Sequence, residues 1–358
     1  MQERCLCLKI RKDQSEKAIV ILGKEMLINR SYKVRKSEEY ILVPILREMT
    51  EVEVQELMNE NVTFETCCDF FVGRDKKPTS YVDLIEDQLA AHLLASLPRS
   101  FDVIGDIAVI EIPTELKDYR SLIGNAVLGA NKNLKTVLEK SGAISGTYRI
   151  REYSVLAGIA KTETIHKEHG CQFFVDLTKA YFSPRLSNEH VRIASLVGSG
   201  ETAIDMFAGV GSFAIHIARR MNNVKVYAID LNPFAFEYMK KNLRLNRVQD
   251  QIVPIFGDAR YVVDSDLSNI ADRVIMNLPE RALEFLDVGL RAVKTSGGTI
   301  HLYSFIDAAQ SLNDIKLKIS YSVRAMGREV KTPIFSKMVR PTAPFEWQVA
   351  FDIQIVSS

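Results

Sequence analysis

The second half of the chain alternates short apolar runs with longer segments of helical spacing. TAIDMF, VKVYAID, IVPIFGD, ADRVIMNLP and GGTIHLYSF have the length and composition of buried strands. Between them, segments such as SFAIHIARRM and NPFAFEYMKKNLRLN carry apolar residues every three or four positions. The alternation predicts an α/β domain over residues 176–358 with a doubly wound sheet. VRAMGREVK and FEWQVAFDIQIV in the tail predict an antiparallel pair at the sheet edge.

The first half has a shorter-range pattern that predicts two smaller modules of mixed helix and strand. In residues 1–72, CLCLKI and EYILVPI are expected strands, and SEKAIVILGKEM and EVEVQELMNEN are expected helices. The polar segment FVGRDKKPTSY, with a glycine and a proline, predicts a linker. Residues 80–175 then combine two expected helices, DLIEDQLAAHLLASL and KDYRSLIGNAVLGAN, with strands in DVIGDIAVIEI and a hairpin in TETIHKEHGCQFFVDL.

Acidic or amide residues end four successive predicted strands of the α/β domain. They are Asp205, Asp230, Asp258 and Asn277. The carboxyl ends of parallel strands meet at one sheet edge, where an acid can hydrogen-bond the ribose of an adenosine ligand. A third acid suits the adenine amino group. Each acid also suits a helix cap or a turn, but four in series favour an S-adenosylmethionine pocket.

A glycine turn, DMFAGVGSF, joins the first of these strands to a helix. Gly209 and Gly211 let the backbone approach a ligand closely. Such a turn before a helix also binds nucleotide phosphates, so it does not identify the cofactor alone. The dinucleotide-binding spacing G-x-G-x-x-G is not met, because Ala214 occupies the third place.

Composition limits the remaining classes of protein. The chain has 358 residues, 47% of them hydrophobic, which is enough for several domain cores. Its five cysteines form no C-x-x-C pair, so neither a disulfide framework nor a metal site is expected. No apolar run approaches a membrane span and the N-terminus MQERCLCLKIRK has no signal-peptide core. The expectation is a cytoplasmic protein without membrane contact.

Cations and aromatic residues gather between residues 149 and 192, although the net charge of the chain is only +1. The cations and histidines are Arg149, Arg151, Lys161, His166, Lys167, His169, Lys179, Arg185, His190 and Arg192. Such a mixture suits RNA, because arginine binds phosphates and aromatic rings stack on unpaired bases. A solvated hairpin beside a core is the other interpretation of this segment.

An ordered set of motifs, YRIRE, IHKEHG, VDLTKAYFSPRL, DMFAGVGSF, AIDLNP and NLP, runs through the chain. In this order the set resembles the archaeal and eukaryotic type of tRNA (guanine-N1)-methyltransferase that acts on guanosine 37. The resemblance covers nearly the whole chain. It implies a class I S-adenosylmethionine-dependent methyltransferase (Rossmann-like) sheet preceded by two smaller α+β RNA-binding domains. It also implies a monomer whose first domain docks on the outer corner of tRNA while the others act on the anticodon stem-loop.

The resemblance also implies residue roles, which the chemistry of the acceptor explains. Guanine N1 must lose a proton before it attacks, so a base is needed near N1 and a positive group near O6. Glu189 stands where the family has its proposed base, and Arg149 where an arginine hydrogen-bonds O6. Asn277 contacts both the base and the cofactor, and Tyr181 packs on the flipped base. The other substrate-binding residues implied are Arg151, Lys167 and Pro279.

The same comparison implies a set of cofactor contacts. These are Arg185, His190, Asp205, Phe207, Gly209, Gly211, Asp230, Leu231, Asn232, Asp258, Ala259, Asn277 and Leu278. His190 stands where the family often has arginine, which makes its contact sensitive to pH. Glu189 also suits the first turn of a helix, Arg149 a phosphate anchor, and Phe207 a core position.

Three other functions remain open at this level. Close relatives of the family transfer the aminocarboxypropyl arm of the same cofactor to the same tRNA position. An N-P-P-Y motif in place of NLP would favour wyosine precursors or a protein glutamine as acceptor, and the chain has NLPE. A non-catalytic tRNA-binding protein is disfavoured because Asp230, Asp258, Asn277 and Glu189 are all present.

Overall fold

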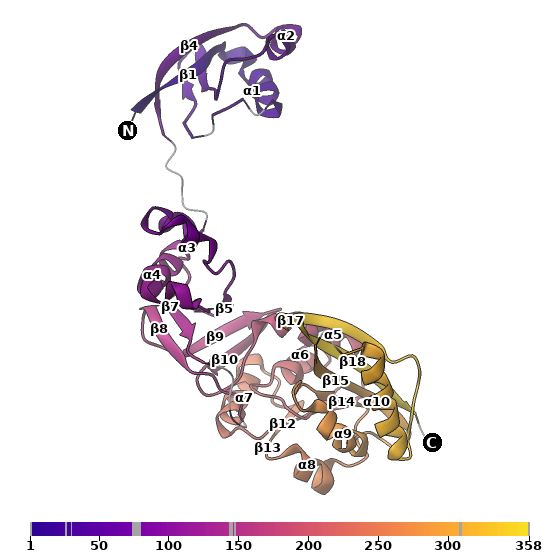
Figure 1. Cartoon of the computed structure of the whole chain (residues 1–358). Coiled ribbons are helices and arrows are strands. Elements are labelled where there is room, and N and C mark those ends of the chain that lie inside the picture. The colour runs from indigo at the N-terminus through magenta and orange to yellow at the C-terminus, as the bar shows by residue number, and fades with distance from the viewer. Residues whose placement is uncertain are drawn as a thin grey trace. The chain divides into compact units, whose positions relative to one another are not determined.

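The apolar runs of the C-terminal half form an eight-stranded sheet in the computed structural model (Figure 1). Its order is β13-β12-β11-β14-β15-β18-β16, and β17 pairs with β18. Neighbours from β13 to β15 are parallel, whereas β18 is antiparallel to its partners. The strands are β11 (Thr202–Asp205), β12 (Lys225–Asp230), β13 (Ile252–Phe256), β14 (Arg273–Met276), β15 (Gly297–Asp307), β16 (Glu329–Val330), β17 (Phe335–Ala343) and β18 (Glu346–Val356).

Helices connect these strands as the spacing predicts. They are α5 (Ser187–Leu196), α6 (Ser212–Arg220), α7 (Pro233–Asn246), α8 (Ala259–Val262), α9 (Leu286–Ala292) and α10 (Leu312–Ala325). Short turns of other helix types precede or extend them at Pro184–Leu186, Val263–Leu267 and Ala282–Phe285. The segment VRAM is the end of α10 rather than part of an edge strand, which corrects the predicted tail. β17, which the pattern did not reveal, is a largely exposed edge strand without a buried face.

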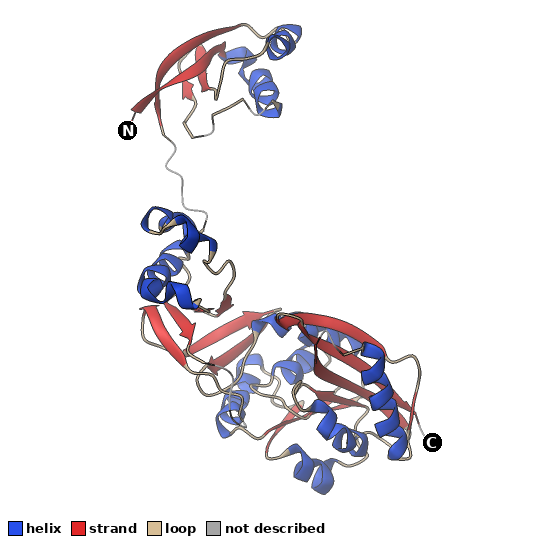
Figure 2. Ribbon diagram, viewed as in Figure 1, coloured by secondary structure: helices blue, strands red, loops and turns tan. Residues whose placement is uncertain are grey.

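Alternating residues of the parallel strands supply two separate cores. Ala203 and its partner Val226 on β12 belong to one cluster, whereas the next residue, Ile204, and its partner Val274 on β14 belong to the other. This is the two-residue period of a sheet that is covered on both faces, as the ribbon in Figure 2 shows. The sequence therefore reads as continuous apolar runs rather than as polar and apolar alternation.

The segment before this sheet contributes to the first of those cores. It has a four-stranded sheet in the order β5-β6-β7-β8 and the antiparallel hairpin β9-β10 predicted around EHG. Its elements are β5 (Asp102–Ile104), β6 (Ile107–Ile110), β7 (Thr136–Lys140), β8 (Tyr153–Gly158), β9 (Glu163–Glu168), β10 (Cys171–Asp176), α3 (Ala91–Ala95) and α4 (Arg120–Ala130), with 3-10 turns at Val82–Leu84, Glu86–Gln88 and Thr114–Tyr119. Ile104, Leu138 and Phe173 pack in the same cluster as Ala203, so residues 80–358 form one compact unit.

One expected helix of this segment is interrupted. DLIEDQLAAHLLASL forms two 3-10 turns and the short helix α3 instead of one continuous helix. Leu89 and Ala90 take extended backbone angles between them, and the Leu89 side chain is buried among Tyr81, Ile85 and other apolar residues. Tertiary burial thus overrides helical propensity here.

Residues 1–79 form a second compact unit. Its sheet has the order β2-β3-β1-β4, and its core includes Leu8, Leu22 and Leu57 from strand and helices. The elements are β1 (Gln2–Arg11), α1 (Ser15–Lys24), β2 (Arg35–Lys36), β3 (Tyr40–Pro44), α2 (Glu51–Asn59) and β4 (Phe64–Val72), with a 3-10 turn at Lys12–Gln14. A capping box between Thr50 and Glu53 begins α2.

The structure describes residues 2–25, 27–29, 31–73, 80–142, 146, 148–307 and 310–356. Most of the expected linker FVGRDKKPTSY lies outside this description. Among the described residues, no helix has the length and apolar character needed to cross a membrane. The five cysteines are all free thiols.

Candidate active site

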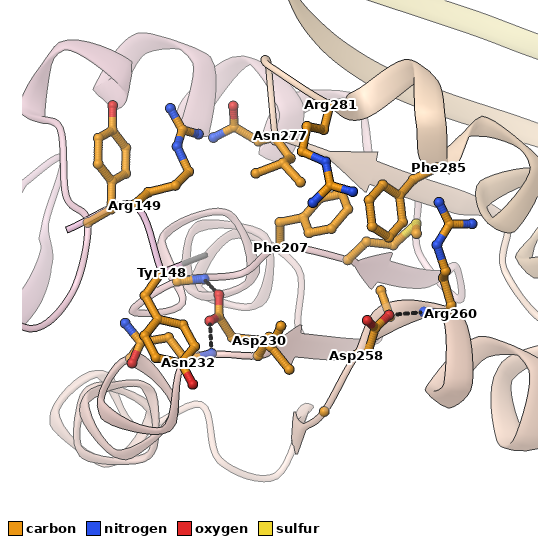
Figure 3. A pocket seen from close by; sticks show the side chains of 18 residues that line it. Tyr148, Arg149, Phe207, Asp230, Asn232, Asp258, Arg260, Asn277, Arg281 and Phe285 are labelled. Atoms are coloured by element: carbon orange, nitrogen blue, oxygen red, sulfur yellow. Dashed lines mark hydrogen bonds between the residues drawn. The ribbon is translucent and has the colours of Figure 1, made fainter. Parts of the chain in front are cut away.

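A cavity of about 250 Å³ opens at the carboxyl ends of β11, β12, β13 and β14. The strand order departs in opposite directions on the two sides of β11, so this is the switch point at which such sheets bind ligands. Figure 3 shows the lining side chains turned toward one space. The predicted residues that line it are Arg149, Tyr181, Phe207, Gly209, Asp230, Leu231, Asn232, Asp258, Ala259, Asn277 and Leu278.

Asp230 holds the glycine turn in place from the end of β12. One of its carboxylate oxygens accepts a hydrogen bond from Gly209 N at 2.6 Å, and the other accepts from Asn232 N at 2.8 Å. Burial raises the pKa of Asp230. Gly209 has a φ of 57° and Gly211 a φ of 94°, in the left-handed region that favours glycine. The turn is therefore shaped by the acid that was expected to meet the ribose.

Asp205 lies beneath this turn rather than on the cavity wall. It is fully buried, and neither carboxylate oxygen has a hydrogen-bond partner among the described residues. Burial, with a contribution from the nearby charge of Asp230, raises the pKa of Asp205 to about 8. An ionised acid buried in this way is costly, so the Asp205 side chain holds its proton at neutral pH.

Aromatic and guanidinium groups from the segments after β11, β13 and β14 line another part of the cavity, and two of them, Arg260 and Phe285, were not predicted from the sequence. The Phe285 ring meets Phe207 edge to face, and the Arg260 guanidinium lies 4.1 Å from the centre of the Phe285 ring. Asp258 caps α8 by accepting a hydrogen bond from Arg260 N at 2.8 Å. The other lining residues that were missed are Tyr148, Met206, Ala235, Gly257 and Arg281. An apolar slot with one acid at its edge suits an adenine ring.

The opposite side of the cavity carries Arg149, Tyr181 and Asn277. The Arg149 guanidinium lies over the Tyr181 ring at 4.9 Å and pairs with Glu280 at 3.3 Å. Arg149 has a φ of 55°, and its Nε atom is buried without a partner among the described residues. Asn277 Oδ1 accepts a hydrogen bond from Gln348 Nε2 at 3.3 Å. This side therefore offers a cation, an aromatic face and an amide.

A neighbouring cavity of about 260 Å³ shares Arg149 and Tyr181 with the first. Arg151 and Arg185 line this second cavity and not the first. Arg185 pairs with Asp102 at 2.6 Å, so the structure places it away from the expected cofactor end. Aromatic and cationic side chains together make this cavity suitable for a nucleotide and its phosphates.

Glu189, the expected base, does not line either cavity. It is 2% exposed and accepts hydrogen bonds from Lys337 Nζ at 2.8 Å, Arg192 Nε at 2.8 Å and Tyr303 Oη at 3.1 Å. Burial acts to raise the pKa of Glu189, but the bonds from Lys337 and Arg192 outweigh it and lower the pKa. In this arrangement the carboxylate is ionised and engaged in the interior.

Four further predicted residues lie outside the cofactor cavity. His190 is buried and shares a hydrogen bond with Glu168 at 2.7 Å, which leaves it no place in the cavity wall. Lys167 lies on β9 and lines a different surface pocket from the two cavities described above. Pro279 follows the lining residues directly, and its carbonyl accepts from Phe305 N. Gly211 begins α6 behind the turn.

Glu168, His190 and His216 form a set of buried side chains that resembles a metal site among the described residues. One Glu168 oxygen lies 2.7 Å from His190 Nδ1 and 3.0 Å from His216 Nε2. Ligands of a tetrahedral zinc ion stand about 3.3 Å apart, so direct hydrogen bonds describe these distances better. Burial acts to lower the pKa of His216, but bonds to Cys171 and Glu168 raise it to about 9.

Comparison with known proteins identifies the family of the chain. Residues 164–330 match the model of the TRM5/TYW2 methyltransferase domain, residues 81–162 the TYW2 N-terminal domain, and residues 7–53 the tRNA methyltransferase 5 N-terminal domain. The chain is 36% identical to tRNA (guanine(37)-N(1))-methyltransferase Trm5b of Pyrococcus abyssi over 92% of each chain.

Two further relatives extend the comparison. The chain is 35% identical to tRNA 4-demethylwyosine(37)-methyltransferase Taw21 of Saccharolobus solfataricus over 72% of this chain and 94% of that one. The solved complex of aTrm5 with tRNALeu superposes with a TM-score of 0.77 at 34% identity, covering 98% of this chain and 99% of that chain.

Proposed function

The chain belongs to the TRM5/TYW2 family of methyltransferases, and we propose that it methylates N1 of guanosine 37 in the anticodon loop of tRNA. S-adenosylmethionine is the methyl donor. One observation carries the proposal: the cavity at the sheet edge joins acids on one side to Arg149, Tyr181 and Asn277 on the other. A nucleoside cofactor and a purine acceptor can thus meet in one continuous space.

The acidic side of the cavity fits the cofactor. Asp230 is positioned for the ribose hydroxyls and Asp258 for the adenine amino group, beside the slot formed by Phe207 and Phe285. When bound, the cofactor supplies an electrophilic methyl group on a sulfonium, and its cationic character suits these acids.

The other side of the cavity fits the acceptor. The bond between N1 of guanine and its proton must break before the N1 electron pair attacks the methyl carbon. As that proton leaves, negative charge grows on O6, where the Arg149 guanidinium supplies positive charge and the Asn277 amide a hydrogen bond. The Tyr181 ring packs against the Arg149 guanidinium, and we propose that the flipped base packs on this tyrosine.

Glu189 remains the proposed base, although its carboxylate is bound to other side chains in the interior. The carboxylate must leave Lys337 or Arg192 before it can reach a proton in the cavity. The lowered pKa keeps it ionised, so it is ready to accept once it is free. Arg151, Arg185 and Lys167 are proposed to hold the anticodon stem-loop rather than the cofactor.

The proposal extends to the whole chain. Residues 1–72 are proposed to dock on the outer corner of tRNA, supported by the family match over residues 7–53. We also propose that the protein is cytoplasmic and that it is a monomer. Gel filtration of the free protein would test the monomeric state.

The test is transfer of radiolabelled methyl to two tRNA transcripts that differ only in guanosine or adenosine at position 37. Label is expected on the guanosine transcript alone. Asn277→Ala should lower the rate about 100-fold, whereas Asn313→Ala, an exposed asparagine of α10, should leave it unchanged. Equal label on both transcripts, or none on either, would contradict the proposal.

A further inference from the structure

Asn277 is held by a line of hydrogen bonds that begins on the C-terminal strands. Arg340 of β17 donates from Nε to Gln348 Oε1 at 2.9 Å. Gln348 of β18 donates in turn from Nε2 to Asn277 Oδ1 at 3.3 Å. Gln348 is 1% exposed, so water does not reach its amide. Loss of either hydrogen bond would leave a buried polar group unpaired, which is unfavourable. Arg340 Nη2 also donates to the Tyr181 hydroxyl at 3.4 Å.

The direction of this line is fixed by its first member. A guanidinium has only donors, so the Gln348 atom that faces Arg340 must be its oxygen. The Gln348 amide nitrogen then faces Asn277, whose oxygen must accept. The Asn277 NH2 group is left to point elsewhere, and Figure 3 shows its nitrogen turned to the side of Arg149.

We propose that Gln348 and Arg340 are positioning residues that present Asn277 to the target base as a hydrogen-bond donor. This rests on the proposed function. The Arg149 guanidinium, which carries only N–H donors, lines the same cavity and supplies a second donor. Two donors select a purine with an acceptor at position 6, which guanine has as O6, and disfavour adenine, which has an amino donor there. The line of bonds thereby contributes to base specificity.

Gln348→Glu tests the direction of the line. A glutamate at this place still accepts from Arg340 but has no N–H for Asn277, so the Asn277 amide is expected to turn its oxygen to the cavity. The single-turnover rate on guanosine 37 at saturating cofactor should fall about 10- to 100-fold. Gln354→Glu places the same charge at an exposed position of β18 and should leave the rate unchanged.

A double-mutant cycle separates positioning from general damage. Gln348→Met should lower the rate about 10-fold in the wild-type background and less than about 2-fold when Asn277 is already alanine. Arg340→Met should also lower the rate, and part of its loss should persist when Asn277 is alanine, because Arg340 also donates to the Tyr181 hydroxyl. Equal losses in both backgrounds, accompanied by a lower melting temperature, would overturn the proposal and leave the methylation of guanosine 37 intact.

The ratio of rates on guanosine 37 and adenosine 37 transcripts gives a readout that a structural role would not move. It should decrease in Gln348→Glu and stay constant in Gln354→Glu. An unchanged ratio in Gln348→Glu would refute the specificity role. A wild-type protein that modifies neither transcript would remove the proposed function and this inference together, a result distinct from the loss in a variant alone.

Discussion

Asp205→Asn is expected to change how the stability of the protein depends on pH. Asp205 is fully buried without hydrogen-bond partners among the described residues, and its pKa is raised to about 8. The folded chain therefore retains a proton that the unfolded chain has already lost above its ordinary pKa. A raised carboxyl pKa stabilises the fold at low pH, and this stability is lost as pH rises toward about 8.

The magnitude follows from the size of the shift. Between the unfolded and folded pKa values, each pH unit lowers the free energy of unfolding by about 1.4 kcal/mol. The free energy of unfolding therefore falls by about 3 kcal/mol between pH 5 and pH 7.5. Asparagine has nearly the same shape as aspartate and does not titrate, so it removes the pH dependence. Its buried amide changes the stability by an amount that does not vary with pH. The expected observable is thus the slope against pH, not the absolute stability of the variant.

Thermal unfolding of the full chain, followed by circular dichroism without cofactor, measures this slope. The melting temperature of Asp205→Asn minus that of the wild type should rise by about 6 to 12 °C between pH 5 and pH 7.5. Asp250→Asn, a change at an exposed acid, should give a difference that does not vary with pH. Parallel curves for Asp205→Asn and the wild type would refute the reasoning.

Three further outcomes are expected. His216, whose pKa is raised to about 9 because bonds to Cys171 and Glu168 outweigh burial, stabilises the fold fully below about pH 6.5; His216→Gln should flatten the loss of melting temperature between pH 7 and pH 9, and an unchanged slope would contradict this. Asp230→Ala removes the acceptor that anchors the glycine turn, and calorimetry should show S-adenosylmethionine binding about 10- to 100-fold weaker; wild-type affinity would count against the assigned cavity. Gly211→Ala should lower the melting temperature by several degrees, because a Cβ at this left-handed position would lie 3.1 Å from a methionine side chain; an unchanged melting temperature would disprove the strain.

The cavity wall was predictable wherever it lies at a strand end. Asp230, Asp258 and Asn277 follow apolar runs directly, and parallel connection brings the carboxyl ends of those runs to one edge. The pattern therefore located this wall of the cavity without knowledge of the sheet order. The hairpin β9-β10 was likewise predicted, because its two runs flank a short turn.

Residues whose position depends on distant packing were not predictable in this way. Phe285 is distant from Phe207 in sequence, and only the tertiary structure brings the two rings together. Glu189 was assigned to the site from its motif, but its partner Lys337 comes from an edge strand that has no clear sequence pattern. Gln348 carries no motif at all, and its contact with Asn277 follows from the antiparallel return of β18 beside β15.

The most direct test of the central claim is mass spectrometry of both products after incubation with S-adenosylmethionine and a guanosine 37 tRNA transcript. The account predicts N1-methylguanosine at position 37 and an equal amount of S-adenosylhomocysteine. Methylthioadenosine together with an aminocarboxypropyl-modified base, or methylation at another nucleotide, would contradict it.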